Sequence, residues 1–289
     1  MSHPRAWTAI VVLLGAVMAG NGQTLTASGA TSPAPAAPVT RLSDFNRDGF
    51  TDLVARDIAG LLWLYPGNGA GGFKARRQMG QGWNHVNRII TPGDVTGGGN
   101  ADIIARDALG RLWLYPGNGA SGLGVRRQIG SGWQNYFFTS AANLNGAGRP
   151  DILAVGSTRI LWLYPLSGNA VFGPRTQVAH GLRAEVLVLG PGDVSGDGRA
   201  DLITTDPSGT TLLYRGNGMG HVATGTPLSI AWGDQKALVT PGNWDRKAGN
   251  DLIVRDDLGG LWLHPGNNAG GFGPRTRIGH GWNIMNSIG

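Results

Sequence analysis

The segment DFNRDGFTDLVARD, residues 44–57, recurs as DVTGGGNADIIARD at 94–107 and as DVSGDGRADLITTD at 193–206. Two further copies are more degenerate. The five acidic loops, spaced by 50, 49, 50 and 50 residues, begin at Asp44, Asp94, Asn143, Asp193 and Asn243. Such a regular repeat indicates one structural unit that is used five times, so a binding site on one unit is expected in several copies.

Each repeat predicts four short β-strands. The acidic loop leads into the run LVARD (53–57) and, after a glycine-containing turn, into LLWLYPGNG (61–69). The run FKARRQMGQGW (73–83) and the apolar run VNRIITPGD (86–94) complete the unit. Apolar residues alternate with a period of two between glycine, proline and asparagine boundaries. This pattern is typical of propeller blades, so the predicted fold is an all-β, five-bladed β-propeller of four-stranded antiparallel blades.

The repeat arithmetic predicts a ring that the chain closes by itself. Aligning the repeats places Gly289 opposite Val39, as Ile89 is opposite Val39, so residues 39–289 contain five units. Blade boundaries are expected near residues 89, 139, 188 and 238, with residues 283–289 packed beside 39–43. A closed ring of this kind would act as a monomer. The alternative is that the five blades belong to a larger ring completed by a second chain.

The N-terminal region differs in composition from the repeats. Residues 1–23 combine a short first segment containing Arg5 with the apolar run TAIVVLLGAVMAG (8–20), which predicts a signal peptide cleaved after Ala19. Residues 24–38 are rich in Ala, Pro, Ser and Thr and predict a disordered linker. We therefore expect a secreted, extracellular protein without a membrane span after cleavage. The alternative is an uncleaved membrane anchor.

Composition excludes several classes of chemistry. The chain has no cysteine, so neither disulfides nor a thiol nucleophile is available. Its formal net charge of +6 favours acidic surfaces and anionic polymers. The basic side chains are mostly arginines at one repeated position rather than a basic run, and no nucleic-acid-binding motif is present, so nucleic acid is not an expected partner. That repeated position is occupied by Arg76, Arg126, Arg175 and Arg275.

Two of the acidic loops have the oxygen pattern of a calcium site, with donors at positions 1, 3, 5, 7 and 9 around a tight turn. In loop one these are Asp44, Asn46, Asp48, the carbonyl of Phe50, and Asp52. In loop four they are Asp193, Ser195, Asp197, the carbonyl of Arg199, and Asp201. Position 12, a glutamate in helix–loop–helix calcium sites, is Ala55 or Thr204 here. About two structural calcium ions on a β-scaffold are therefore expected.

The other three loops have lost part of this calcium-ligand pattern, and we call them the eroded loops. Loop two keeps Asp94 and Asp102 and is a weaker candidate, and in loop five the Lys247 ammonium could stand where a cation would bind. For the eroded loops we favour the alternative that the carboxylates cap turns by accepting backbone N–H bonds.

The pattern D-x-[DN]-x-D-G-x-x-D, followed by a strand and repeated along the chain, resembles the FG-GAP/VCBS repeat family. The segments W-L-Y-P-G-N-G and G-x-G-W resemble the versions found in secreted actinobacterial proteins. The resemblance covers residues 39–289. It implies a propeller with calcium in the intact loops, related to the integrin head and to certain fungal lectins, and therefore a role in binding or adhesion.

Tryptophan occupies two repeated positions. The W-L-Y set, in which blade four has Leu212, is expected to pack between blades; it comprises Trp63, Trp113, Trp162 and Trp262. The G-x-G-W set precedes a polar amide, and the pairs are Trp83 with Asn84, Trp133 with Gln134, and Trp282 with Asn283. A flat aromatic ring beside hydrogen-bonding groups suits a sugar ring, and repeated weak sites would gain avidity on a polymer. Packing between blades is the open alternative for this second set.

The leading hypothesis is a calcium-stabilised, lectin-like module that binds an extracellular glycan or cell-surface polymer at several sites. A protein–protein interaction or adhesion scaffold without a sugar site is the alternative, and an extracellular hydrolase or lyase is the third. No G-x-S-x-G or H-E-x-x-H motif occurs, and the position of His180 and His280 is Gln81 or Ser131 in other repeats. We therefore assign no catalytic residue and expect a protein that is not an enzyme.

Overall fold

The computed structural model describes residues 43–141, 143–182, 187–206, 208–230 and 235–289. The predicted signal peptide, its anchor alternative and the linker lie outside the described residues. Among the helices of the described part, none has both the length and the apolar character needed to cross a membrane.

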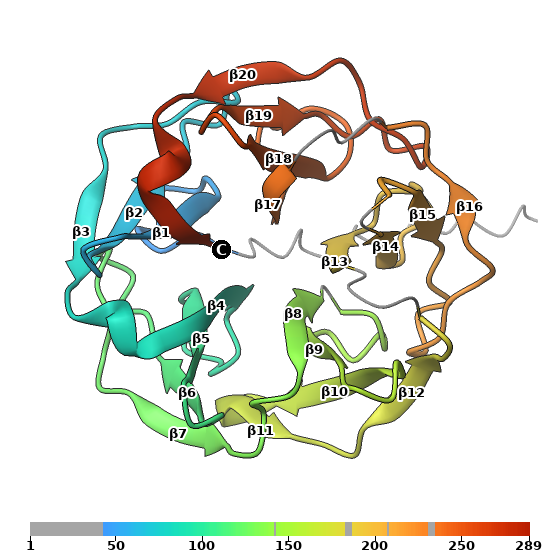
Figure 1. Ribbon diagram of the computed structural model, residues 1–289, viewed down its shortest axis with the longest axis horizontal. Coiled ribbons are helices and arrows are strands. Elements are labelled where there is room, and N and C mark those ends of the chain that lie inside the picture. The colour runs from blue at the N-terminus through green and yellow to red at the C-terminus, as the bar shows by residue number, and fades with distance from the viewer. Residues whose placement is uncertain (1–42, 142, 183–186, 207, 231–234) are drawn as a thin grey trace, which may run out of the picture. The chain divides into compact units, whose positions relative to one another are not determined.

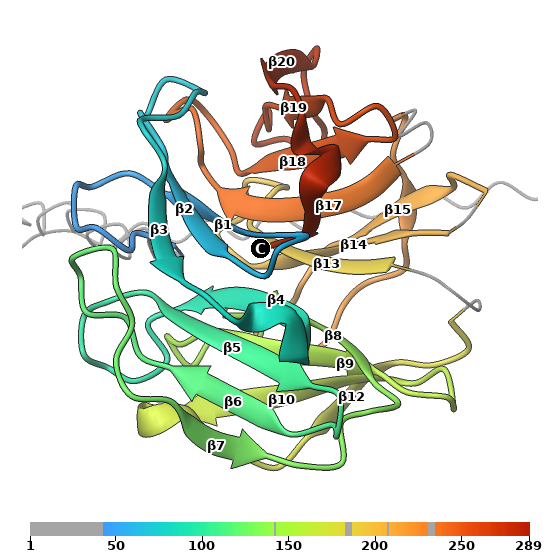
Figure 2. The same cartoon turned by 60° about the vertical axis from the view of Figure 1, so that its left-hand side comes forward.

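Five antiparallel sheets stand side by side around a ring (Figure 1); in blades two to five the strands follow sequence order from the inside outward, and in blade one the C-terminal β21 is the inner strand. Figure 2 shows this order most clearly in blade two, from β4 to β7. The all-β, five-bladed propeller is therefore confirmed.

The strand bounds follow blade by blade. Blade one contains β1 (Asp52–Asp57), β2 (Leu62–Pro66), β3 (Arg77–Gly80) and β21 (Met285–Ile288). Blade two contains β4 (Val86–Gly93), β5 (Asp102–Asp107), β6 (Leu112–Tyr115) and β7 (Arg127–Gly130). Blade three contains β8 (Phe137–Ala141), β9 (Asp151–Val155), β10 (Leu161–Ser167), the short β11 (Val171–Phe172) and β12 (Thr176–Ala179).

Blade four contains β13 (Leu187–Gly192), β14 (Asp201–Thr205), β15 (Thr211–Tyr214) and β16 (Thr226–Pro227). Blade five contains β17 (Gln235–Gly242), β18 (Asp251–Asp256), β19 (Leu261–His264) and β20 (Thr276–Gly279). The described helices are single 3-10 turns, namely η1 (Trp83–His85), η2 (Gly168–Ala170) and η3 (Trp282–Ile284). The inner strands of blades two to five begin one to three residues before the predicted boundaries.

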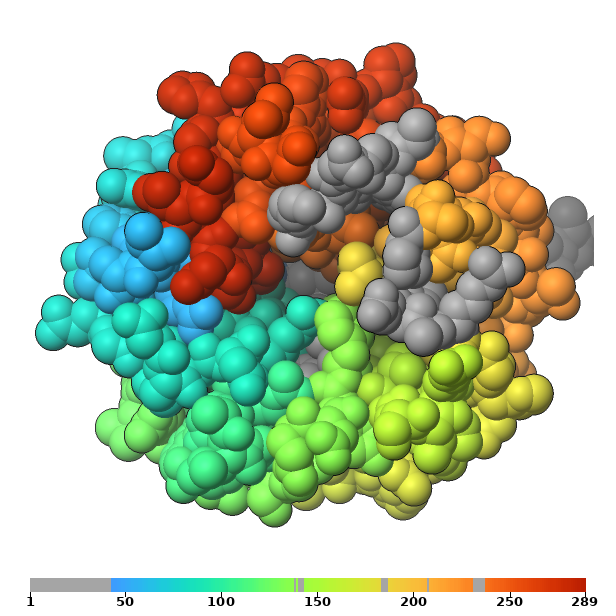
Figure 3. All heavy atoms as spheres, in the orientation of Figure 1, coloured from blue at the N-terminus to red at the C-terminus, as the bar shows by residue number. Residues whose placement is uncertain are grey.

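The chain closes its own ring. The C-terminal strand β21 pairs with β1 as the inner strand of blade one, and the red C-terminal atoms lie against the blue first blade in Figure 3. Gly289 and Val54 exchange two backbone hydrogen bonds of 2.8 and 3.0 Å. The same edge of β1 continues to Ser43, whose carbonyl accepts from Asp52 N at 2.8 Å. Both ends of the propeller thus build one inner strand, as the repeat arithmetic predicted, although residues 39–42 lie outside the described residues.

The core lies between neighbouring blades, because successive side chains of a strand point to opposite faces. In β2, the buried Leu62 and Leu64 pack toward blade two with Ile103. The alternate residues Trp63 and Tyr65 pack toward the blade-five cluster. Each blade is therefore stabilised only beside its neighbours, which explains why ring closure matters for the whole molecule.

Candidate functional site

One buried aspartate holds each acidic loop on its blade. Asp201, only 1% exposed, begins β14. Its Oδ2 accepts hydrogen bonds from Val194 N at 2.9 Å and Ser195 N at 2.8 Å, and its Oδ1 accepts from Gly216 N at 3.1 Å. The carboxylate therefore connects the acidic loop to the turn after β15.

The equivalent aspartate accepts from the acidic loop in every blade, and in blades one, two, four and five it also accepts from the turn glycine. At this position stand Asp52, Asp102, Asp151, Asp201 and Asp251, each accepting the backbone N–H of the second loop residue. The contact persists in loops two, three and five, where the calcium pattern is eroded. The turn-capping interpretation thus accounts for this residue without a metal ion. The prediction that Asp52 and Asp201 also ligate calcium stays a prediction.

The glycine that donates to this aspartate is required sterically. A Cβ on Gly216 would lie 1.9 Å from the carbonyl oxygen of Ala200. The matching contact at Gly117 would be 2.0 Å from the oxygen of Ala101. The P-G-N-G segment therefore carries glycine where two backbones meet, which lets the N–H reach the buried carboxylate.

Burial raises the pKa of this aspartate in blades one, two, three and five. Burial raises the pKa of Asp52 to about 7, opposed by the N–H groups of Phe45 and Gly67, and the charges of Asp48 and Asp44 add to the rise. Burial likewise raises the pKa of Asp151 to about 6. Burial thus disfavours the ionised form of these two aspartates, and in loop one the neighbouring carboxylates add to this effect.

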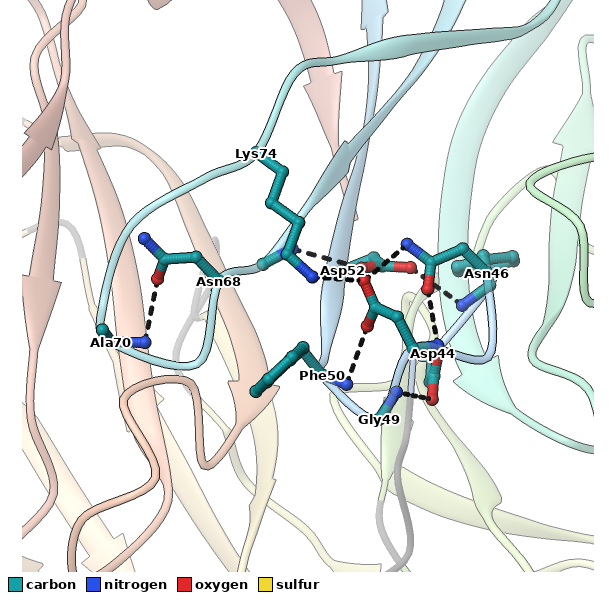
Figure 4. A network of polar contacts seen from close by, with 11 residues as sticks. Asp44, Asn46, Gly49, Phe50, Asp52, Asn68, Ala70 and Lys74 are labelled. Carbon is teal, nitrogen blue, oxygen red and sulfur yellow. Dashed lines mark hydrogen bonds and ion pairs between the residues drawn. The ribbon is translucent and has the colours of Figure 1, made fainter.

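Loop one folds as a series of turns capped by its own side chains (Figure 4). Asp44 Oδ2 accepts from Gly49 N at 3.0 Å, and Asp48 Oδ1 accepts from Phe50 N at 3.0 Å. The ammonium of Lys74 lies 2.7 Å from Asp48 Oδ2. Burial would raise the pKa of Asp48, but the hydrogen bonds from Lys74 and Phe50 outweigh it and lower the pKa. Lys74 therefore already supplies a positive charge to this loop.

Loop four has similar capped turns but no lysine beside them. Asp193 Oδ1 accepts from Gly196 N at 2.7 Å, and Asp197 Oδ1 accepts from Arg199 N at 2.9 Å. Ser195 Oγ is the predicted calcium ligand at position 3 of the loop. It is a buried oxygen with no hydrogen-bond partner among the described residues. Blade four has Ala223 where blade one has Lys74.

Within the described ranges, no group of three or more acidic or histidine side chains converges as a metal site. In loop two, Asp94 accepts from the N–H groups of Gly97, Gly98 and Gly99. In loop five, Lys247 Nζ lies 3.3 Å from Asp245 Oδ2, where the sequence placed an ammonium. These contacts agree with the turn-capping interpretation of the eroded loops.

The G-x-G-W tryptophans are buried between blades, which contradicts their prediction as sugar platforms. Trp83, Trp133 and Trp282 are only 5%, 7% and 6% exposed. Their rings pack on a tyrosine of the next blade. The centroid distances are 4.5 Å for Trp83 and Tyr115, 4.9 Å for Trp133 and Tyr164, and 4.4 Å for Trp282 and Tyr65. A ring face covered in this way has no room for a sugar, so the packing alternative describes this set.

The local backbone explains why these rings turn inward. Gly82 and Gly281 adopt left-handed conformations immediately before Trp83 and Trp282. The indole of Trp83 then lies over Gly80, where a Cβ would be 2.6 Å from the indole nitrogen. The amides that follow remain exposed, namely Asn84, Gln134 and Asn283. Structure therefore separates the two members of each predicted sugar-binding pair.

The W-L-Y tryptophans are only partly buried: Trp63 and Trp113 pack against clusters between blades as expected, and each of the four also lies beneath an exposed arginine. The guanidinium carbon stands 4.0 to 4.4 Å from the ring centroid. The pairs are Arg76 with Trp63, Arg126 with Trp113, Arg175 with Trp162, and Arg275 with Trp262. Each pair gains a cation–π contact at the surface.

One further residue completes this arrangement, which we call the rim triad: an arginine, its tryptophan and the residue two positions after the tryptophan, which is tyrosine in blades one to three and histidine in blade five. In blade two, Arg126 Nη1 donates to Tyr115 Oη at 3.2 Å. The equivalent bonds in blades one and three are 3.3 and 3.2 Å, while blade five has His264 in place of tyrosine. Blade four lacks the triad, with Leu212 and Gly225 at the tryptophan and arginine positions.

In blades one, two and five an aspartate orients the indole from the edge of the ring. Trp113 Nε1 donates to Asp107 Oδ2 at 2.9 Å, and the matching bonds to Asp57 and Asp256 are 2.8 and 2.7 Å. Burial would raise the pKa of Asp107, but hydrogen bonds led by that of Trp113 outweigh it and lower the pKa to about 2. Sequence analysis missed this set, although each arginine follows its tryptophan by 13 residues and each aspartate precedes it by six.

Two cavities adjoin these features. One of about 730 Å³ lies among the first three acidic loops and is lined by Asp44, Arg47, Asp94 and Arg149, among others. The second, of about 570 Å³, is lined by Asn46, Asp48, Lys74 and Arg76 from blade one and by Ser121 from blade two, among others. The second cavity therefore joins acidic loop one to a rim triad across a blade boundary.

Fold and repeated surface sites together define a β-propeller binding module. The model of the FG-GAP-like repeat matches residues 44–105 and 143–204. These two stretches are therefore FG-GAP-like repeats, which confirms the resemblance read from the acidic loops. No curated protein matches the chain.

Solved structures of similar fold include two lectins. One is an Agrocybe aegerita lectin whose structure is described as the basis for recognising non-reducing terminal N-acetylglucosamine, with 20% identity and a TM-score of 0.46. The match covers 79% of this chain and 62% of the lectin, so the chain spans less than two thirds of that protein's length. The other is the BP39L lectin of Burkholderia pseudomallei, with 16% identity, a TM-score of 0.43, and coverage of 82% and 68%.

Proposed function

We propose that the protein is a secreted, non-catalytic module that binds an extracellular glycan through several weak, equivalent sites. The observation that carries this proposal is the rim triad, repeated on four of the five blades. Equivalent sites at one-blade intervals suit a polymer with repeating units. Such sites raise overall affinity through effective concentration, even when each site is weak.

The chemistry of a triad suits sugar hydroxyl groups. A guanidinium offers N–H donors in a fixed plane, and a tyrosine hydroxyl both donates and accepts. In blade two the exposed group is Arg126, and the largely buried Tyr115 holds it through its hydroxyl. Exposed amides such as Gln134 add further donors and acceptors. The glycan site is therefore assigned to the W-L-Y positions instead of the buried G-x-G-W positions.

The proposal is tested by retention on a panel of immobilised polysaccharides, with calcium and with chelator. We expect selective retention on some polysaccharides and none on the bare support. A panel that retains nothing under either condition would contradict glycan binding and direct attention to the protein-interaction alternative.

We also propose a structural calcium ion at loop four, held by Asp193, Ser195 and Asp197. The partnerless Ser195 Oγ and the lack of a lysine beside Asp197 support this choice. Loop one is the second candidate, with Lys74 as a competitor for the same negative charge. The ion would neutralise clustered carboxylates and hold the loop, and it has no assigned role in ligand chemistry.

Calcium is expected to raise the melting temperature of the wild-type protein relative to chelator. A ligand that binds only the folded state stabilises it by about 2.7 kcal/mol at a hundredfold excess over its dissociation constant. Asp197→Ala should abolish most of this calcium-dependent rise, while Asp257→Ala, which removes an exposed carboxylate outside the loops, should not. Identical melting curves of the wild type with calcium and with chelator would refute the calcium proposal.

A further inference from the structure

We propose that the ligand is an acidic polysaccharide and that the rim-triad arginines bind its anionic groups. This inference rests on the proposed glycan-binding function and specifies the substrate class. Its chemistry is that of a planar oxyanion carried on successive sugar units, a carboxylate or a sulfate ester. The argument depends on how the guanidinium groups are held and on what they leave available.

Each triad arginine is fixed in place without being neutralised. In blade two, Arg126 lies 4.4 Å above Trp113 and donates through Nη1 to Tyr115 Oη and toward His85 Nε2 at 3.1 Å. Among the described residues, no carboxylate forms an ion pair with any of the four triad arginines. Their charge is therefore available to a ligand.

The remaining donors match an oxyanion. A guanidinium has five N–H groups in one plane, and Nη1 alone makes the hydrogen bonds of Arg126. Its Nε and Nη2 edge can bind two oxygens of one carboxylate or sulfate in parallel, the arrangement in which arginine binds most strongly. Because the indole and the tyrosine hydroxyl already orient the side chain, little conformational freedom is lost on binding.

The aspartate at the edge of the indole strengthens the arrangement without competing for the arginine. Asp107 accepts from Trp113 Nε1 at 2.9 Å and from Arg111 Nε at 2.7 Å, so its charge is engaged at the edge of the ring. A carboxylate bound to the indole N–H makes the ring face more negative, which favours the cation above it. The aspartate at the ring edge thus leaves the guanidinium over the ring face free of an ion pair with it.

The neighbourhood of blade one favours a sugar-bound anion over a small free one. Arg76 lines the cavity of about 570 Å³ together with Lys74, Asn46 and Asp48. This cavity is large enough for a sugar unit, and it supplies polar groups besides the cations. Four triads around one ring also match an anion that repeats along a chain.

The experiment compares two double variants with equal loss of charge. Arg126→Gln with Arg275→Gln removes two triad guanidiniums, from blades two and five. Arg127→Gln with Arg277→Gln removes two exposed arginines that adjoin the triads in sequence but do not lie over a tryptophan. Binding is measured to immobilised polygalacturonate, dextran sulfate and neutral dextran at fixed salt, and the melting temperature of each variant is recorded.

We expect the wild type to bind polygalacturonate, dextran sulfate or both, and the two anionic probes then distinguish carboxylate from sulfate as the preferred group. The triad variant should lose about tenfold or more in affinity, because charge-assisted bonds are lost at two sites. The control variant should lose less than about threefold, the residual effect of general charge. Arg126→Lys with Arg275→Lys keeps both positive charges but removes the planar pair of N–H donors. This variant should also lose affinity.

Several results would overturn the inference. Equal loss in the two Gln variants, or full binding by the Lys variant, would show attraction by net charge alone. A lower melting temperature with unchanged binding would show that the arginines only cover their tryptophans. Equally tight binding of a single-stranded oligonucleotide would show a general polyanion surface. Binding to neutral dextran alone would remove the acidic ligand but leave the glycan-binding function, whereas no binding to any polysaccharide would remove both.

Discussion

Asp201→Ala is expected to lower the free energy of unfolding by about 3 kcal/mol or more, measured by urea denaturation in chelator. Three backbone N–H groups, from Val194, Ser195 and Gly216, lose their acceptor. A buried donor left unsatisfied costs about 1–3 kcal/mol. Chelator is essential to the design, because it removes any contribution of calcium at loop four.

The matched control is Asp197→Ala in the same loop. Asp197 is exposed and accepts one hydrogen bond, from Arg199 N. In chelator this variant should lose less than about 1 kcal/mol. Should Asp201→Ala be costly only when calcium is present, the aspartate would act through the metal ion, and the capping role would be wrong.

Trp133→Ala is expected to destabilise the protein by about 3–5 kcal/mol, the usual cost of removing a large buried aromatic side chain. Trp133 is 7% exposed and packs on Tyr164 and Phe172 of the next blade. Its loss leaves a cavity between blades two and three. Thermal or urea unfolding measures the effect, with polysaccharide retention recorded on the folded variant.

Trp113→Ala provides the contrasting change, because it removes the same side chain from a rim triad. Trp113 is partly exposed beneath Arg126, so this variant should lose less stability than Trp133→Ala and more polysaccharide retention. The reverse pattern, in which Trp133→Ala melts like the wild type but no longer binds, would restore Trp133 as a sugar platform and remove the triads from the site.

The fold could be predicted from sequence because the repeat is strict and the ring arithmetic closes. The interval between Asp44 and Asp94 fixes the length of a blade, and the alternation of Leu62, Trp63, Leu64 and Tyr65 fixes a strand with two packed faces. The position of Gly289 relative to Val39 placed the C-terminal strand in blade one. These inferences needed only periodicity, which survives considerable change in individual residues.

The two tryptophan sets could not be separated in this way. Both tolerate leucine in one blade, at Leu212 and at Leu182, so substitution did not distinguish core from surface. Local geometry decides which tryptophans are exposed. The left-handed backbone of Gly82 turns Trp83 inward, whereas Trp63 lies at the surface beneath the side chain of Arg76. The constant interval of 13 residues between tryptophan and arginine was the available signal.

The acidic loops show a second limit of sequence patterns. The order of oxygens in Asp193, Ser195 and Asp197 is that of a calcium loop, but the same residues also suit capped turns. The ninth-position aspartate is present in all five repeats because it holds the loop to the blade. A pattern that serves two purposes cannot distinguish them, and the hydrogen bonds of the five copies had to be compared.

The central claim, that repeated rim sites bind a repetitive polymer, is tested most directly by displacement with oligosaccharides of increasing length. The oligosaccharides are cut from the polysaccharide that retains the protein, and their concentrations are compared per sugar unit. We predict a drop of about tenfold or more in the displacing concentration once an oligosaccharide reaches a second blade. Equal potency per sugar unit at every length would contradict the claim.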